Sequence, residues 1–273
     1  MKSGKIIKVF LSFIVIFLAI KLEANVNPPI KVLYFDRTPF YIKNLDNSVS
    51  GFLIEITKLI LQKAKIQYEF QETPTKRILS MIEKGTEPLI SVGWFKNPQR
   101  EDFAIFTEPI YKNRPQIIII QKEKAAYLSK NPTMKEILSK RFKLGVIDGF
   151  SYGKWVDGEI AKYPQENIFK FIGDPSNSVV MLENNRIDFC FISYEEADYF
   201  FSKSAGARNL LTVKQIADAP EGDLRYLMLN KKFDKDLLDK INKAIIEVKE
   251  SQEYKKIISF SSNIQIKTST LQQ

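Results

Sequence analysis

The chain has 273 residues, 41 of them basic and 32 acidic, with a formal net charge of +9, one cysteine and no histidine. Without histidine, serine–histidine and cysteine–histidine catalysis are excluded, and a single cysteine forms neither an internal disulfide nor a thiolate cage for a metal. No metal site is therefore expected. No cofactor and no catalytic residue are expected either, because the remaining candidate carboxylates form no diagnostic motif. The lysines are spread along the chain and no nucleic-acid motif is present, so no nucleic-acid partner is expected.

The first 24 residues have the pattern of a secretory signal peptide. Lys2, Lys5 and Lys8 precede an apolar run over 9–20, and Ala24 offers a small residue at a cleavage point. A membrane span needs about 20 apolar residues, so an uncleaved anchor is the weaker alternative. Cleavage after residue 24 removes four lysines and one glutamate, which leaves a net charge of +6 on an exported chain.

The first half of the mature chain alternates strand and helix patterns. Buried strands are predicted over 30–35, 66–70 and 89–92, and helices over 52–64 and 75–84. This order with short connections predicts a parallel sheet.

The pattern then repeats. Strands are predicted over 117–121, 143–147, 168–171 and 188–192, and helices over 151–162, 176–185 and 194–202. Cys190 lies in an apolar strand and is predicted to be a small buried hydrophobe. A turn-rich break at 219–222 precedes a strand over 225–229, an amphipathic helix over 234–250 and a polar tail.

Arg100 lies just beyond the predicted carboxyl end of the strand at 89–92. Ligands of open α/β sheets bind outside the carboxyl ends of the strands. An arginine there can hold a carboxylate through two parallel hydrogen bonds. The alternative is a surface arginine that pairs with Glu101 or Asp102.

Short motifs spread over nearly the whole mature chain resemble one known family. They are Thr-Pro-Phe at 38–40, Gly-Phe-Leu-Ile-Glu-Ile at 51–56, Lys-Arg-Ile-Leu at 76–79, Pro-Gln-Arg at 98–100, Phe-Thr-Glu-Pro-Ile-Tyr at 106–111, Gly-Val-Ile-Asp-Gly-Phe-Ser at 145–151, Arg-Ile-Asp at 186–188 and Tyr-Lys-Lys-Ile at 254–257. In their order and spacing, the chain is similar to family 3 of the bacterial extracellular solute-binding proteins.

The resemblance implies a two-lobe, type II periplasmic-binding-protein fold of class α/β. Each lobe would be a mixed, mainly parallel sheet flanked by helices, with two hinge crossings between the lobes. On this basis we expect a signal peptide over 1–24, lobe 1 over 26–109 and 226–262, and lobe 2 over 115–220. Hinges are expected at 110–114 and 221–225, and a flexible tail at 263–273.

The resemblance also implies a ligand site. It places Arg100 as the clamp for a ligand carboxylate and Ser151 as a small hydroxyl or backbone donor at the start of a helix, where anions are favoured. An ordinary N-cap is the alternative for Ser151.

Two departures from the family pattern bear on the ligand. Gly93, Trp94 and Phe95 stand where small hydroxyl residues are usual, and Ser193 stands at the place of the aspartate that binds an α-ammonium. Glu195 is a candidate substitute for that charge. A neutral serine supplies no charge to an ammonium, which favours an organic acid or a modified or anionic amino acid.

The remaining candidate ligand contacts are aromatic or cationic. Tyr34 and Tyr152 would add to aromatic walls, as expected of a small-molecule site, and Arg77 would add a second cation. A core position for the aromatic residues and a solvated helix face for Arg77 are the alternatives.

The resemblance implies a periplasmic, monomeric receptor that delivers a small polar or anionic ligand to the membrane permease of an ABC transporter. An enzyme of dehydratase type on the same fold is one alternative, with Asp36, Glu55, Asp148 and Glu195 as possible acid–base groups. A stand-alone sensor for a membrane receptor is the other.

Overall fold

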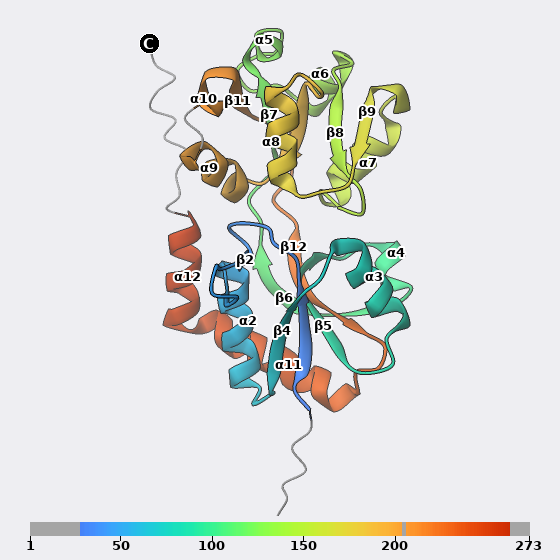
Figure 1. Cartoon of the computed structure of the whole chain (residues 1–273), viewed down its shortest axis with the longest axis vertical. Helices are drawn as coiled ribbons and strands as arrows, with labels where there is room; N and C mark the ends of the chain where they lie inside the picture. The colour runs from blue at the N-terminus through green and yellow to red at the C-terminus, as the bar shows by residue number, and fades with distance from the viewer. Residues whose placement is uncertain (1–27, 204–205, 263–273) are drawn as a thin grey trace, which may run out of the picture.

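A computed structural model describes residues 28–203 and 206–262, which form two α/β lobes, one above the other in Figure 1. The predicted signal peptide and the predicted tail over 263–273 lie outside these residues. Each lobe contains one five-stranded sheet, and the first lobe also carries the short ribbon β2 (Ile42–Lys43) and β3 (Val49–Ser50).

The first sheet has the strand order β4-β1-β5-β12-β6. Its strands are β1 (Ile30–Tyr34), β4 (Tyr68–Glu72), β5 (Leu89–Phe95), β6 (Ala104–Lys112) and β12 (Leu224–Asn230). β1 pairs in parallel with β4 and β5, whereas β12 is antiparallel to β5 and β6. The helices are α2 (Phe52–Lys63), α3 (Thr75–Lys84), α4 (Pro98–Glu101), α11 (Lys235–Glu250) and α12 (Gln252–Ser262).

The second sheet has the order β11-β7-β10-β8-β9 and is also mixed. Its strands are β7 (Ile117–Gln121), β8 (Leu144–Ile147), β9 (Ile168–Phe171), β10 (Phe189–Ile192) and β11 (Leu211–Gln215). The helices are α5 (Lys122–Ala125), α6 (Met134–Ser139), α7 (Lys154–Lys162), η1 (Gln165–Asn167), α8 (Pro175–Glu183), α9 (Tyr194–Lys203) and α10 (Ala207–Leu210).

The strands β5, β7, β8 and β10 are buried on both faces, which explains their continuous apolar runs. In β1, Val32 packs into a cluster with residues of α2 and α11, whereas its neighbour Leu33 packs into a cluster with residues of α3. Figure 1 shows α2 and α11 on one side of this sheet and α3 on the other. The isoleucines of β7 divide in the same way, because successive side chains of a strand point to opposite faces. Each fully buried Leu or Ile contributes about 1.5–3 kcal/mol.

Two chain crossings connect the lobes, between β6 and β7 and between β11 and β12. The crossings touch, because the Asn113 N–H donates to the Asp223 carbonyl at 3.0 Å. A Cβ on Gly222 would collide with the Asn113 backbone, so glycine permits this approach. The exact lobe and hinge boundaries stay predictions.

Each sheet has two parallel and two antiparallel strand pairs, so the sheets are mixed as predicted but not mainly parallel. Two further corrections concern residues of the predicted site. β5 continues through Gly93, Trp94 and Phe95, which were predicted to follow the strand. The helix predicted from Ser151 begins only at Lys154, with Gly153 as its N-cap, so an N-cap role for Ser151 is wrong. No helix in the described part of the chain is long and apolar enough to cross a membrane.

Candidate functional site

The carboxyl ends of strands from both sheets face one another between the lobes. β1 leads to Arg37 and β5 leads to Arg100, while β8 leads to Phe150 and β10 leads to Glu196. This convergence is the arrangement in which α/β proteins bind ligands.

Between the lobes lies a cavity of about 20 Å³, room for about one water molecule. Its lining is aromatic, hydroxyl-bearing and cationic, and consists of Phe35, Arg37, Tyr41, Thr75, Gly93, Trp94, Phe95, Arg100, Gly149, Phe150, Ser151 and Arg225. The lining therefore holds three arginines and, among the described residues, no aspartate or glutamate.

Arg100 is held by the end of β5. The Asn97 side chain caps α4 by accepting from the Arg100 N–H at 2.9 Å. The Arg100 side chain donates from Nη1 to the Phe95 carbonyl at 2.8 Å. The guanidinium carbon lies 4.7 Å from the centre of the Trp94 ring, whose Nε1 donates to Ser91 Oγ at 2.7 Å.

The charge of Arg100 has no close counterion. The residue is only 6% exposed, and no carboxylate of the described residues forms an ion pair with it. Burial therefore lowers the pKa of Arg100 to about 10. A guanidinium held dry and unpaired beside a cavity is suited to an anion.

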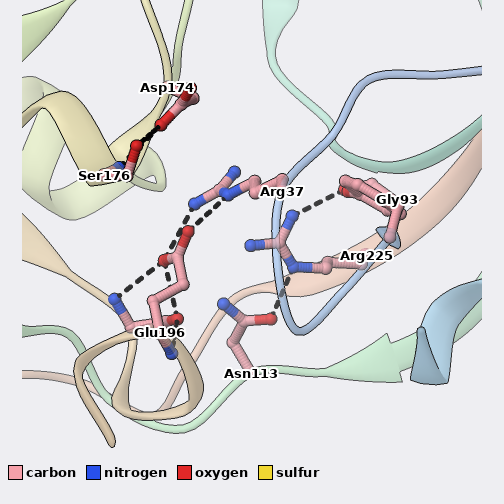
Figure 2. A network of polar contacts seen from close by, with 9 residues as sticks. Arg37, Gly93, Asn113, Asp174, Ser176, Glu196 and Arg225 are labelled. Atoms are coloured by element: carbon pink, nitrogen blue, oxygen red, sulfur yellow. Dashed lines mark hydrogen bonds and ion pairs between the residues drawn. The ribbon is translucent and has the colours of Figure 1, made fainter. Parts of the chain in front are cut away.

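Arg225 is a second buried cation, 2% exposed, at the start of β12. Its Nη1 donates to the Gly93 carbonyl at 2.7 Å and its Nε donates to Asn113 Oδ1 at 2.7 Å (Figure 2). The guanidinium lies between Phe40 and Phe95, 4.5 and 4.4 Å from their ring centres. Burial lowers its pKa too, and its Nη2 has no hydrogen-bond partner among the described residues.

The third cation, Arg37, forms an ion pair between the lobes. It donates from Nε and Nη2 to the two carboxylate oxygens of Glu196 at 2.6 and 3.1 Å, as Figure 2 shows. The side chains are 11% and 1% exposed. Burial alone raises the pKa of Glu196, but the charge and hydrogen bonds of Arg37 and the Ser193 hydroxyl hold that pKa below its usual value.

The other carboxylates near the cavity are also engaged. Tyr111 donates to Glu195 Oε1 at 2.8 Å, whereas Glu195 Oε2 is buried and has no hydrogen-bond partner among the described residues. Asp157 of α7 accepts from the Ser151 hydroxyl and, at 2.8 Å, from the Tyr152 N–H. Burial raises the pKa of Asp157 although both hydrogen bonds oppose this.

Further contacts hold the lobes together over the cavity. The rings of Phe35 and Phe150 meet edge to face with centroids 5.5 Å apart, and Arg37 lies 4.9 Å from the centre of the Phe150 ring. At the surface, Lys76 of α3 pairs with Asp148 at 2.5 Å. The structure is thus a closed arrangement of the two lobes.

The nine residues predicted as ligand contacts divide into two groups. Five line the cavity: Gly93, Trp94, Phe95, Arg100 and Ser151. Four do not: Arg77 is exposed on α3, whereas Tyr34, Tyr152 and Ser193 are buried beside the cavity or in the core. As contacts of a ligand, all nine stay predictions.

Sequence reasoning missed Arg37, Arg225, Tyr41, Thr75 and Gly149 as lining residues and Glu196 as the partner of Arg37. Arg37 carried the same signal as Arg100, since it follows the carboxyl end of a buried strand. Arg225 carried a weaker signal, a charge at the start of an apolar strand. Within residues 28–203 and 206–262, no group of three or more Cys, Asp or Glu side chains could hold a metal.

Two α/β lobes with mixed sheets, two crossings and a cavity between the lobes define a type II periplasmic-binding-protein fold. The solved structure of an ancestral arginine-binding protein bound to arginine has this fold and is similar to the chain with a TM-score of 0.67. That likeness has 21% sequence identity and covers 85% of this chain and 97% of the other.

The sequence model of the bacterial extracellular solute-binding proteins, family 3, matches residues 31–259, and the chain belongs to this family. Among curated proteins, the arginine-binding extracellular protein ArtP of Bacillus subtilis (strain 168) is 23% identical over 224 residues, 81% of either chain. A probable histidine-binding protein of Neisseria gonorrhoeae is 23% identical over 225 residues, which are 80% of this chain and 77% of that protein.

Proposed function

We propose that this chain is a periplasmic receptor that captures a small solute carrying a carboxylate and delivers it to the permease of an ABC transporter. The observation that carries the proposal is Arg100, a buried guanidinium that lines the interlobe cavity without a carboxylate partner among the described residues. A bound carboxylate would supply the missing counterion through two parallel hydrogen bonds.

The proposed cycle follows from the closed arrangement. A cavity of about 20 Å³ admits no amino-acid-sized molecule, so the lobes must part at the crossings for a solute to enter. A solute that touches Arg100 on one lobe and Ser151 on the other binds best when the lobes approach again, and this differential affinity drives closure.

Relatives named for arginine and histidine do not predict the ligand of this chain. A cationic side chain would lie beside Arg37, Arg100 and Arg225 with no acidic residue among the described lining residues. Like charges in a dry site repel strongly. We therefore infer that the ligand is not a cationic amino acid.

The test is a thermal-shift screen of the mature protein against amino acids, hydroxy acids and dicarboxylates. A solute at 100 times its dissociation constant adds about 2.7 kcal/mol of stability, a rise of roughly 5–10 °C in Tm for this size. Mass spectrometry should recover the solute unchanged, as expected of a receptor, whereas a converted solute would favour an enzyme.

Two arginine variants test whether Arg100 in particular binds the carboxylate of the solute. Arg100→Gln should weaken binding of the identified solute about 30- to 100-fold, because charged hydrogen bonds contribute about 2–3 kcal/mol. Arg186→Gln, an equal loss of charge at an exposed residue beyond α8, should leave the affinity within about twofold. Equal affinity of wild type and Arg100→Gln would remove the basis of the proposal.

A further inference from the structure

The carboxylate of Glu196 is occupied by the protein itself. Its Oε1 accepts from Arg37 Nε at 2.6 Å, and its Oε2 accepts from Arg37 Nη2 at 3.1 Å, the Ser193 hydroxyl at 2.8 Å and the Ser193 N–H at 3.3 Å. A carboxylate has about four lone-pair sites, and four donors already address this one. A cation from a ligand would have to displace Arg37.

Covalent geometry places an α-ammonium close to the carboxylate clamp. The ammonium is bonded to the carbon next to the carboxylate, so a ligand held by Arg100 would carry that charge within the same cavity. Two carbonyls of the lining are already in use, since the Gly93 carbonyl accepts from Arg225 and the Phe95 carbonyl accepts from Arg100. The hydroxyls of Thr75 and Ser151 carry no charge.

The positive electrostatic potential of the lining also disfavours a ligand ammonium. Arg37, Arg100 and Arg225 all line it, and the nearby carboxylates Glu195 and Asp157 are not among its lining residues. Each added positive charge would therefore lie beside Arg100 and Arg225, which pair with no described carboxylate, at low dielectric. A ligand that carries only negative charge meets the opposite situation.

On the basis of the proposed function, we propose that Arg37 fills the place of a ligand ammonium and thereby selects carboxylates that lack an α-amino group. The class includes 2-hydroxy and 2-oxo acids, whose oxygen can accept from the Thr75 hydroxyl or from an arginine. Their carbon chains would pack against Phe35, Trp94 and Phe150. Arg37 is then a specificity-determining residue at the carboxyl end of β1.

The test is isothermal titration of the mature protein with matched pairs, an amino acid and the 2-hydroxy acid of the same side chain. Pairs with the leucine, phenylalanine and glutamate side chains cover apolar, aromatic and anionic groups. For the pair that binds, we expect wild type to prefer the hydroxy acid by about tenfold or more. Wild type that binds the amino acid equally or better overturns the inference.

Variants of the ion pair separate selection from a merely structural role. Arg37→Gln exposes the Glu196 carboxylate to an ammonium, so the preference for the hydroxy acid over the amino acid should fall about tenfold or more. Adding Glu196→Gln removes that carboxylate and should restore part of the preference, and Arg37→Lys keeps the cation and should keep the preference. A preference that is the same in wild type and Arg37→Gln contradicts the selection.

The two proposals fail in different ways. If amino acids bind wild type well and Arg100→Gln abolishes that binding, the selection by Arg37 is wrong and the carboxylate receptor stands. If no carboxylate of either class binds, or if Arg100→Gln binds as well as wild type, the receptor proposal fails and the selection falls with it. Should Arg37→Gln not fold, the titration of wild type with the matched pairs still decides the selection, because equal or better binding of the amino acid overturns it.

Discussion

Arg100 is a cation that the folded chain holds at a cost. Its pKa is lowered to about 10 by burial, and a pKa unit corresponds to about 1.4 kcal/mol, so the charge destabilises the unliganded fold by roughly 3 kcal/mol at neutral pH. The hydrogen bond to Phe95 and the stacking on Trp94 offset part of this, at about 1 kcal/mol each.

Arg100→Met should therefore separate stability from binding. The variant keeps the apolar stem and loses the charge, so the free energy of unfolding without solute should stay the same or rise by up to about 2 kcal/mol. Urea unfolding of the mature protein measures this, while the affinity for its solute falls as in Arg100→Gln. A fall in stability of more than about 1 kcal/mol would mean that Arg100 is mainly structural.

Gly93 permits the close packing of the site under β5. Its φ is +76°, and a Cβ there would lie 2.5 Å from Tyr41 Oη and 2.8 Å from Leu53. Gly93→Ala should lower the free energy of unfolding by about 1–3 kcal/mol, because a positive φ and a packed core both resist the methyl group. Gly158→Ala is the matched control, since nothing lies within 4 Å of that position on α7. It should be neutral or stabilise by up to about 1 kcal/mol, and an equal loss in both variants would contradict this account.

At the scale of elements, the start of α9 couples the site to pH. The pKa of Glu196 is held below its usual value, so the contribution of this carboxylate is fully present above its ordinary pKa near 4.5 and is lost as pH falls through the folded value. The free energy of unfolding of wild type minus that of Glu196→Gln should be constant at neutral pH and shrink below about pH 4. Chemical unfolding at several pH values checks this prediction. A difference that grows on acidification would mean that folding raises the pKa of Glu196 instead of lowering it.

The regular elements could be predicted from local patterns, whereas part of the site could not. The apolar run of β7 and the amphipathic face of α11 mark buried elements directly. The rule that ligands bind beyond the carboxyl ends of strands found Arg100, and applied to β1 it would have found Arg37. Arg225 reaches the cavity only because β12 lies antiparallel beside β5, with Arg225 opposite Phe95. That pairing joins residues far apart in the chain, and no local pattern reports it.

Local sequence patterns also could not predict which carboxylate lies near Ser193, the residue at the place of the family's aspartate. Ser193 was predicted as the neutral replacement of a charged residue, with Glu195 as the candidate substitute. The structure instead brings the Glu196 carboxylate to the Ser193 hydroxyl, one helical turn further on. Both adjacent glutamates are buried, and which of them pairs with Arg37 depends on the angle at which α9 leaves β10 and on the position of Arg37 in the other lobe.

At the scale of the whole molecule, the Arg37–Glu196 pair makes the closed form available without a solute. Both side chains are almost fully buried between the lobes, so salt screens this pair little. Removing one partner of a buried pair costs about 3–5 kcal/mol, since it leaves the other charge dry and unpaired. Opening of the lobes relieves that cost by returning the remaining charge to water.

Arg37→Gln should therefore shift the unliganded protein toward an open form, lowering the closed-to-open ratio at least about a hundredfold. Small-angle scattering should show a larger radius of gyration than for wild type, and a saturating solute should reduce it again. Lys76→Ala is the control, because it also removes an interlobe ion pair, one whose side chains are 58% and 44% exposed. Such a pair contributes about 0–1 kcal/mol, so Lys76→Ala should scatter like wild type. Equal opening in both variants would mean that the number of interlobe contacts, and not the buried charge of Glu196, controls closure.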